Sequence, residues 1–384
     1  MDIVKEVKDI FESKFQTKPV LFASPGRVNL IGEHTDYNEG FILPAAIDKA
    51  VYVAVSLRTD DTIHLHAVDF NEDYIVTVNE MAPVVNGWSN YILGVVDQLQ
   101  KNGYAVPGFN MVIRGNVPSG AGLSSSAALE CAVIFALNDL LGLDIPKIDM
   151  VKMAQLAEHT YAGVKCGIMD QFASMMSIDG HVIRLDCRSL EYDYIPFNFK
   201  DISVVLFNTQ VTHNLASSEY NTRREECEAG VAIIKKKHPH VQSLRDVTLD
   251  WVEQYLEKDS KIYNRCKFVT GENQRLLDGC DAIADNDLES FGALMFETHE
   301  GLSKLYEVSC KELDFLVDTV KENKAVLGSR MMGGGFGGCT INLVKTSEID
   351  EVVADVTGKY QEKYGIKPPV YICTLQKGTY KIEI

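Results

Sequence analysis

A glycine- and serine-rich loop that leads directly into a long apolar helix constrains this chain most. The loop reads Pro118-Ser-Gly-Ala-Gly-Leu-Ser-Ser-Ser-Ala-Ala128, between a strand-like segment at Phe109–Arg114 and a helix predicted over Leu123–Leu141. Glycines let the backbone adopt positive φ and approach a ligand closely. The first helical turn offers free N–H groups, and the helix dipole favours negative charge. The loop therefore predicts a cradle for phosphate, and a glycine turn with a serine helix cap is the alternative.

The loop matches none of the usual nucleotide-binding loops. A Walker A loop ends in Gly-Lys-Ser/Thr, but no lysine lies between Arg114 and Lys147. A protein-kinase loop requires His-Arg-Asp and Asp-Phe-Gly segments, which the sequence lacks. A dinucleotide fingerprint requires a third glycine where Ser125 stands. Other segments must therefore identify the class of loop.

Composition limits the classes of partner and compartment. The formal net charge of −17 argues against a nucleic-acid or anionic-membrane partner, so an anionic ligand such as ATP would need local positive groups. The sequence has no apolar run of membrane-spanning length and no signal-peptide pattern at its start. Its nine cysteines are scattered, without a Cys-x-x-Cys pair. We expect a cytoplasmic, monomeric protein with reduced thiols.

Helical and strand-like segments are mixed without a regular βαβ alternation, which predicts an α+β fold rather than a doubly wound sheet. Short β-rich segments and helical segments share the first half, and long helical segments occupy 217–236, 261–284, 287–308 and 311–321 in the second. The 384 residues suffice for two domains, and we place a soft boundary near residue 200, which gives domains 1–200 and 201–384. No Pro/Ser-rich linker marks this boundary, so we expect the halves to pack closely.

The polar segment Gly26–Gly40 favours a site for a polyol. Carboxylates accept hydrogen bonds from hydroxyl groups, and two or three of them can fix the pattern of a sugar. A solvated loop would also explain the charges, but not Arg27 and Asn29 within an apolar run beside a strand. The charged and hydrogen-bonding residues are Arg27, Asn29, Glu33, His34, Asp36 and Tyr37.

Two later segments add glycine and carboxylate groups. Met331–Thr340 formally matches Gly-x-Gly-x-x-Gly, but a predicted strand follows it, so we expect a glycine-rich turn between two strands that allows a ligand or another backbone to approach. In 157–171, Glu158 ends one predicted helix and Asp170 opens the next. Asp170 could serve only as the N-cap of that helix.

Together these segments resemble the GHMP small-molecule kinases and, within them, the galactokinases. Three motifs occur in order: Gly26–Tyr37, the Pro-x-Gly-Ala-Gly-Leu-Ser-Ser-Ser-Ala loop, and the Gly-Gly-Gly-Phe-Gly-Gly turn. The run Glu33-His-Thr-Asp-Tyr37 is the sugar-specific one. The resemblance covers nearly the whole chain and implies the two-domain GHMP kinase fold, with the active site in the cleft between the domains.

The resemblance implies ATP-dependent phosphorylation of galactose at its anomeric hydroxyl, giving galactose 1-phosphate and ADP, the first committed step of galactose catabolism. Asp170 matches the catalytic aspartate, and Arg27 matches the arginine that stabilises charge beside it. The ATP phosphates would lie on Gly120, Ala121, Gly122, Leu123, Ser124, Ser125 and Ser126, with Mg²⁺ at Ser126 and Glu158. The sugar-binding positions would be Glu33, His34, Thr35, Asp36, Gly167, Asp170 and Tyr220. We expect Ser126 at the metal, and Ser124 and Ser125 at the helix cap or phosphate.

Asp170 can accept the proton of the attacking hydroxyl, and charge pairing with Arg27 favours its ionised form. The same pairing lowers its basicity, so the extent to which it acts as a true base is open.

Two alternative functions stay open as well. One is a kinase for N-acetylgalactosamine or arabinose, because the sequence gives no pocket volume near the sugar 2-position. The other is a non-catalytic sensor of galactose and ATP, against which the intact Ser124–Ala128 run and Asp170 speak.

Overall fold

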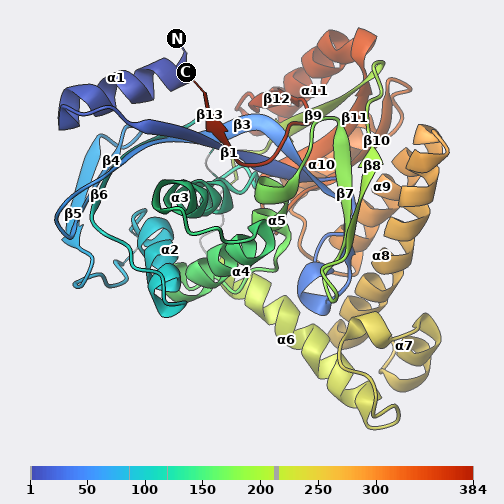
Figure 1. Cartoon of the computed structure of the whole chain (residues 1–384). Coiled ribbons are helices and arrows are strands. Elements are labelled where there is room, and N and C mark those ends of the chain that lie inside the picture. The colour runs from blue at the N-terminus through green and yellow to red at the C-terminus, as the bar shows by residue number, and fades with distance from the viewer. Residues whose placement is uncertain (1, 86, 119, 212–215, 384) are drawn as a thin grey trace.

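A mixed, six-stranded sheet organises the N-terminal half of the protein (Figure 1). The computed structural model describes residues 2–85, 87–118, 120–211 and 216–383. The strand order is β13-β1-β3-β6-β4-β5, and β4 and β6 run parallel whereas the other pairs are antiparallel. The strands are β1 (Val20–Asn29), β3 (Pro44–Leu57), β4 (Thr62–Ala67), β5 (Glu72–Thr77), β6 (Phe109–Gly115) and β13 (Tyr380–Ile382).

Helices cover both faces of this sheet because its central strands are apolar on both sides. Successive side chains of a strand point to opposite faces. Leu21 accordingly packs with α1 (Ile3–Phe15), and its neighbour Phe22 packs in the main core on the other face. That main core contains α2 (Asn90–Lys101), α3 (Ser125–Leu141), α4 (Lys147–Ala157) and α5 (Met169–Met176). The phosphate-loop helix α3 is therefore a central, buried element.

The C-terminal half combines an antiparallel four-stranded sheet with long helices. The sheet order is β10-β11-β9-β12, and α9 and α10 pack on β10. The strands are β9 (Ile202–Asn208), β10 (Val326–Met331), β11 (Cys339–Lys345) and β12 (Val370–Cys373). The helices are α6 (Ala216–Lys235), α7 (Leu249–Tyr255), α8 (Lys261–Ala284), α9 (Leu288–Lys304), α10 (Lys311–Val320) and α11 (Ile349–Tyr364). A third sheet joins β2 (Phe41–Ile42), β7 (His181–Asp186) and β8 (Tyr192–Pro196).

The predicted α+β class is confirmed, and the helix predicted at 261–284 matches α8. Neither α7 nor β13 was predicted. The domain boundary near residue 200 stays a prediction. The C-terminal strand β13 returns to the N-terminal half, where it pairs with β1. Figure 1 shows this return as the dark red β13 beside the blue β1.

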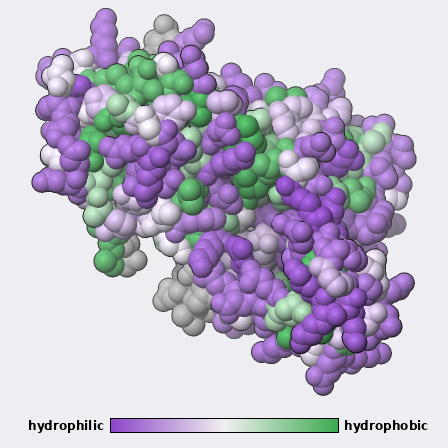
Figure 2. All heavy atoms as spheres, turned by 60° about the horizontal axis from the view of Figure 1, so that its bottom comes forward, coloured by the Kyte–Doolittle hydropathy of each residue, from purple (hydrophilic) through white to green (hydrophobic). Residues whose placement is uncertain are grey.

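Hydrophilic side chains cover most of the face seen in Figure 2, and apolar residues form separate groups among them. This agrees with the net charge of −17. None of the helices within the described residues is long and apolar enough to cross a bilayer. The nine cysteines are all free thiols, as expected.

Candidate active site

A cavity of about 270 Å³ opens where the two halves of the chain meet. This volume is close to the lower limit for ligand pockets, roughly 300 Å³, and suits a small polar molecule. The first half contributes Arg27, Glu33, His34, Asp36, Glu158, Val164, Cys166, Gly167, Met169 and Asp170, and the second half contributes Tyr220, Gly333, Gly334 and Gly335. The structure therefore brings most of the predicted sugar-binding residues to one place.

Asp170 and Arg27 form an ion pair in the cavity wall. Nε and Nη2 of Arg27 both lie 2.8 Å from Oδ1 of Asp170, and the Ser124 hydroxyl donates to Oδ2 at 2.5 Å. The N-cap of α5 is Ile168, so the prediction of Asp170 at the N-cap is wrong. Asp170 lies in the first turn of α5 instead, where its side chain turns toward Arg27 and the negative charge still suits the helix dipole.

The phosphate loop packs against β1 at Arg27. Gly120 and Gly122 have positive φ, as expected for a loop that approaches a ligand. The Leu123 carbonyl accepts from the Arg27 backbone N–H at 3.1 Å, and the Gly122 carbonyl accepts from the Arg27 guanidinium. Ser124 is the N-cap residue of α3, but its φ of 57° turns the hydroxyl away from the helix, so it caps no N–H. The loop thus lies behind the cavity wall, where Ser124 and Gly122 hydrogen-bond the lining residues Asp170 and Arg27.

His34 enters the cavity as a neutral imidazole. Burial lowers the pKa of His34 to about 3. Its Nδ1 pairs with the Tyr37 hydroxyl at 2.8 Å, and that hydroxyl pairs with the Tyr306 hydroxyl at 2.7 Å. No described residue pairs with the buried Nε2. The Tyr220 ring centroid lies 5.4 Å from that of His34, so Tyr220 of the second half lies beside it.

Asp36 owes its place in the cavity to the absence of a side chain at Gly167. A Cβ atom on Gly167 would lie only 1.7 Å from Oδ2 of Asp36. Burial and the nearby negative charge of Asp170 raise the pKa of Asp36 to about 7. Thr35, in contrast, does not line the cavity: it is fully buried, and its hydroxyl donates to the Gly32 and Phe41 carbonyls. Thr35 therefore stabilises the conformation of the Gly26–Gly40 segment rather than contacting the cavity.

Glu158 belongs to a buried acidic cluster behind the phosphate loop. It follows α4 directly, at the start of a short π-helical turn, Glu158–Ala162. The Ser126 hydroxyl donates to its Oε1 at 3.2 Å, and the Gln171 amide bridges its Oε2 and that of Glu130 at 2.7 and 2.9 Å. Burial, followed by the charge of Asp170, raises the pKa of Glu158 to about 7. Burial also raises the pKa of Glu130 well above its usual range.

The glycine-rich turn lies between β10 and β11, as predicted, and three of its glycines line the cavity. Gly333 also donates its N–H to Oε1 of Glu33 at 2.9 Å. Val164, Cys166 and Met169 line the cavity too, although no sequence signal singled them out. Arg330, the residue that pairs with Glu33, was missed as well. The sequence could have indicated this residue, because an arginine within a strand of otherwise small and apolar residues is usually buried and therefore needs a partner.

Three family models match the chain. The model of the GHMP kinases N terminal domain matches residues 90–177, and that of the GHMP kinases C terminal matches residues 281–362. The galactokinase galactose-binding signature matches residues 9–57, which include Arg27 and the polar loop. Mevalonate kinase of Methanococcus jannaschii shares the fold, with a TM-score of 0.68 at 20% identity over 94% of this chain and all of that one. The fold is thus that of the GHMP kinases.

Relatives with higher identity define the family within that class. The galactokinase of Thermosipho africanus is 40% identical over 94% of this chain and 99% of its own length. That of Clostridium acetobutylicum is 39% identical over the whole of both chains. The crystal structure of Lactococcus lactis galactokinase complexed with galactose matches with a TM-score of 0.95 at 33% identity, over 99% of this chain and all of that one. The chain belongs to the galactokinase family.

Proposed function

We propose that this protein transfers the terminal phosphoryl group of ATP to the anomeric hydroxyl of galactose, and that the reaction takes place in the cavity between the two halves. The observation that carries the proposal is the joint placement of the Arg27–Asp170 ion pair and the Glu33–Asp36 loop around one small cavity, with the phosphate loop bonded to that ion pair. A galactokinase family member that holds these groups together has both an acceptor site and a donor site.

In this proposal galactose binds through the side chains that the cavity offers. Glu33 and Asp36 accept hydrogen bonds from sugar hydroxyls, and the unpartnered Nε2 of His34 pairs with another. Tyr220 covers the sugar from the second half, and Gly167 leaves the room that Asp36 needs. We do not include Thr35, whose hydroxyl is used within its own loop.

The transfer needs one proton acceptor and charge stabilisation. Asp170 accepts the proton of the anomeric hydroxyl, whose oxygen forms a bond to the terminal phosphorus while the bond from phosphorus to the ADP oxygen breaks. A carboxylate has about four lone-pair positions, so Asp170 can take this donor in addition to Arg27 and Ser124. Arg27 stabilises the charge that develops beside it. Phosphoryl transfer depends mainly on such positioning and electrostatics.

Ser126 and Glu158 fit a magnesium site. Mg²⁺ prefers oxygen ligands and usually takes only one or two from the protein, and these two side chains offer a hydroxyl and a carboxylate 3.2 Å apart. The described residues contain no group of three or more acidic, histidine or cysteine side chains that could hold a metal, so nucleotide phosphates would complete the shell. When bound, Mg²⁺ would neutralise part of the triphosphate charge.

A coupled ADP-release assay over a panel of hexoses, N-acetylgalactosamine and arabinose, with the phosphate position determined by NMR, tests the proposal. We expect ADP release with galactose and a phosphate at the anomeric position. Higher kcat/KM with N-acetylgalactosamine or arabinose would assign a related sugar kinase. Binding of galactose and ATP without ADP release would assign a sensor and contradict the proposal. The monomeric state, the cytoplasmic location and the absence of nucleic-acid or membrane partners stay predictions.

A further inference from the structure

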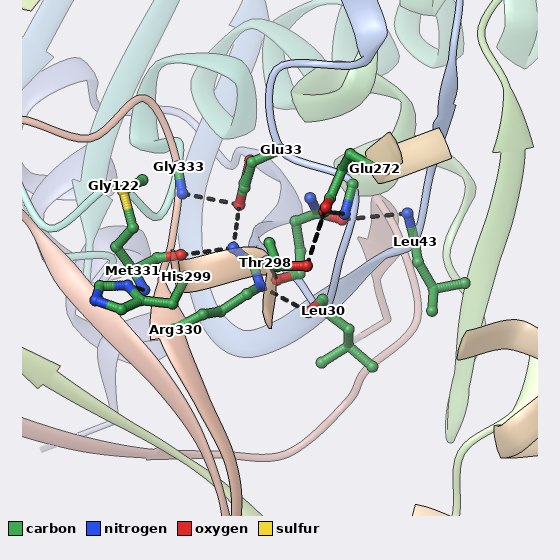
Figure 3. A network of polar contacts seen from close by, with 12 residues as sticks. Leu30, Glu33, Leu43, Gly122, Glu272, Thr298, His299, Arg330, Met331 and Gly333 are labelled. Carbon is green, nitrogen blue, oxygen red and sulfur yellow. Dashed lines mark hydrogen bonds and ion pairs between the residues drawn. The ribbon is translucent and has the colours of Figure 1, made fainter. Parts of the chain in front are cut away.

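Arg330 connects the C-terminal sheet to the proposed sugar loop. It lies near the end of β10 and is fully buried. Its Nη1 donates to Oε1 of Glu33 at 3.0 Å, and its Nε donates to the Leu30 carbonyl at 2.8 Å. Nη1 also donates to the carbonyl of Met331, and Nη2 to that of Asn29. Figure 3 shows the guanidinium between these groups, with the Glu33 carboxylate above it.

The two oxygens of Glu33 have different surroundings. Oε1 accepts from both Arg330 and the Gly333 backbone N–H. No described residue hydrogen-bonds Oε2, although the Glu33 side chain lines the cavity. A carboxylate with one oxygen held by two protein donors can rotate little. The other oxygen is therefore kept as an acceptor at a fixed position in the cavity.

The loop that carries Glu33 is held at a second point by the same half of the protein. Glu272 of α8 accepts from the Gly32 backbone N–H at 2.9 Å, and the Thr298 hydroxyl of α9 donates to both of its oxygens at 3.0 and 3.1 Å. Figure 3 shows this second group beside the Arg330 network. Glu272 thus holds the loop backbone, whereas Arg330 contacts the carboxylate itself.

We infer that Arg330 is a positioning residue for sugar selectivity: it fixes Glu33 so that its free oxygen accepts one particular hydroxyl of the sugar. The inference rests on the proposed role of Glu33 as a galactose ligand. A site built to hydrogen-bond a hydroxyl rejects the analogue that lacks it, because a buried charged acceptor is left unpaired. Arg330 strengthens this rejection because a carboxylate held in place cannot turn to another partner.

The test compares kcat/KM for galactose and its four monodeoxy analogues, at the 2-, 3-, 4- and 6-positions. We expect Glu33→Gln to lower the penalty for one of the four analogues by about 10-fold or more, and to leave the other three penalties nearly unchanged. Arg330→Lys keeps the charge but loses the planar fork of donors. It should lower the same penalty, at the same position, with KM for ATP unchanged.

Arg265→Met is the control for loss of stability. Arg265 is equally buried in the C-terminal half, pairs with Glu226 and Glu307, and does not line the cavity. Removal of one partner from a buried ion pair is strongly destabilising. We therefore expect Arg265→Met to lower the melting temperature while all four penalties stay as in the wild type. A loss of selectivity in this control would overturn the inference, because instability alone would then explain the effect.

Two outcomes separate the inference from the proposal beneath it. If Glu33→Gln changes no penalty, the role of Glu33 as a sugar ligand fails. If Glu33→Gln changes one penalty and Arg330→Lys changes none, Glu33 is a ligand but Arg330 does not position it. Should Arg330→Lys not fold, the double variant Glu33→Gln/Arg330→Met decides, because it replaces the whole ion pair by neutral groups. It should match Glu33→Gln alone, and a further separate loss would overturn the inference.

Discussion

The two ends of the cavity differ in how most of their carboxylates are held. At the sugar end, Glu33 pairs with Arg330 at 3.0 Å and Asp170 pairs with Arg27 at 2.8 Å. At the phosphate end, no basic side chain in the described part of the chain forms an ion pair with Glu158 or Glu130. There the donors are the amide of Gln171, the hydroxyl of Ser126 and the thiol of Cys166.

This difference indicates which end is complete without a ligand. A buried carboxylate with a guanidinium partner is compensated, whereas one held by neutral donors keeps part of its desolvation cost. This cost raises the pKa of Glu158 to about 7 and that of Glu130 well above its usual range. Among the described residues of the sugar end, only Asp36 lacks such a partner, and burial raises its pKa to about 7 as well. The hydroxyl groups of a neutral sugar can donate hydrogen bonds to it. The phosphate end lacks one positive charge, which a cation would supply.

The largest effect should come from the Arg27–Asp170 pair. Asp170→Asn removes the proton acceptor, and Arg27→Ala removes the charge beside it, so each should lower kcat by about 10²- to 10⁴-fold. Steady-state kinetics measures the loss, and circular dichroism checks the fold. Asp139→Asn, the same change at the surface pair with Lys381, is the control and should keep full activity. Full activity in either cavity variant would refute the assignment of this pair.

A smaller effect should appear at the phosphate end, and only in the magnesium dependence. Ser126→Ala and Glu158→Gln should raise the Mg²⁺ concentration for half-maximal rate by about 10- to 100-fold, since each removes a proposed ligand oxygen. Rates measured over a Mg²⁺ series at saturating ATP give this value. Ser125→Ala, next in the same loop, should leave the half-maximal Mg²⁺ concentration unchanged. Equal shifts in all three variants would place the metal elsewhere.

The smallest effect concerns the room around Asp36. Gly167→Ala places a Cβ atom against the Asp36 carboxylate and should displace it, which would raise KM for galactose about tenfold, or about 1.4 kcal/mol. KM for ATP should not change. Gly358→Ala is a suitable control, because a Cβ atom at Gly358 meets nothing within 4 Å. If both variants keep the wild-type KM for galactose, Asp36 is not a sugar ligand of this site.

Much of the site could be predicted from sequence because its motifs are local. The phosphate loop, the Glu33–Tyr37 run and the glycine-rich turn each carry their chemistry within about a dozen residues of sequence. Their backbone requirements are equally local, as the positive φ of Gly120 and Gly122 illustrates. The family resemblance then supplied their common function, which the family models and relatives support.

The partners of these motifs could not be predicted, because they come from distant parts of the chain. Arg330 reaches Glu33 across 297 residues, and no local pattern indicates which carboxylate a buried arginine meets. The left-handed backbone of Ser124, which directs its hydroxyl to Asp170 rather than to a helix cap, is likewise a property of the packed loop. Thr35 fits the sugar motif in sequence but turns inward in the fold.

Proton release on nucleotide binding tests the contrast between the two ends most directly. At pH 6.5 a Glu158 carboxyl with a pKa of about 7 carries its proton most of the time, and Mg²⁺ would bind only after that proton leaves. Calorimetry of MgATP binding in buffers of different ionisation enthalpy counts the protons released. The wild type should release up to about one proton more than Glu158→Gln at pH 6.5, and this difference should vanish by about pH 8.5. Equal proton release by both proteins at pH 6.5 would contradict the view that the phosphate end lacks a cation at Glu158.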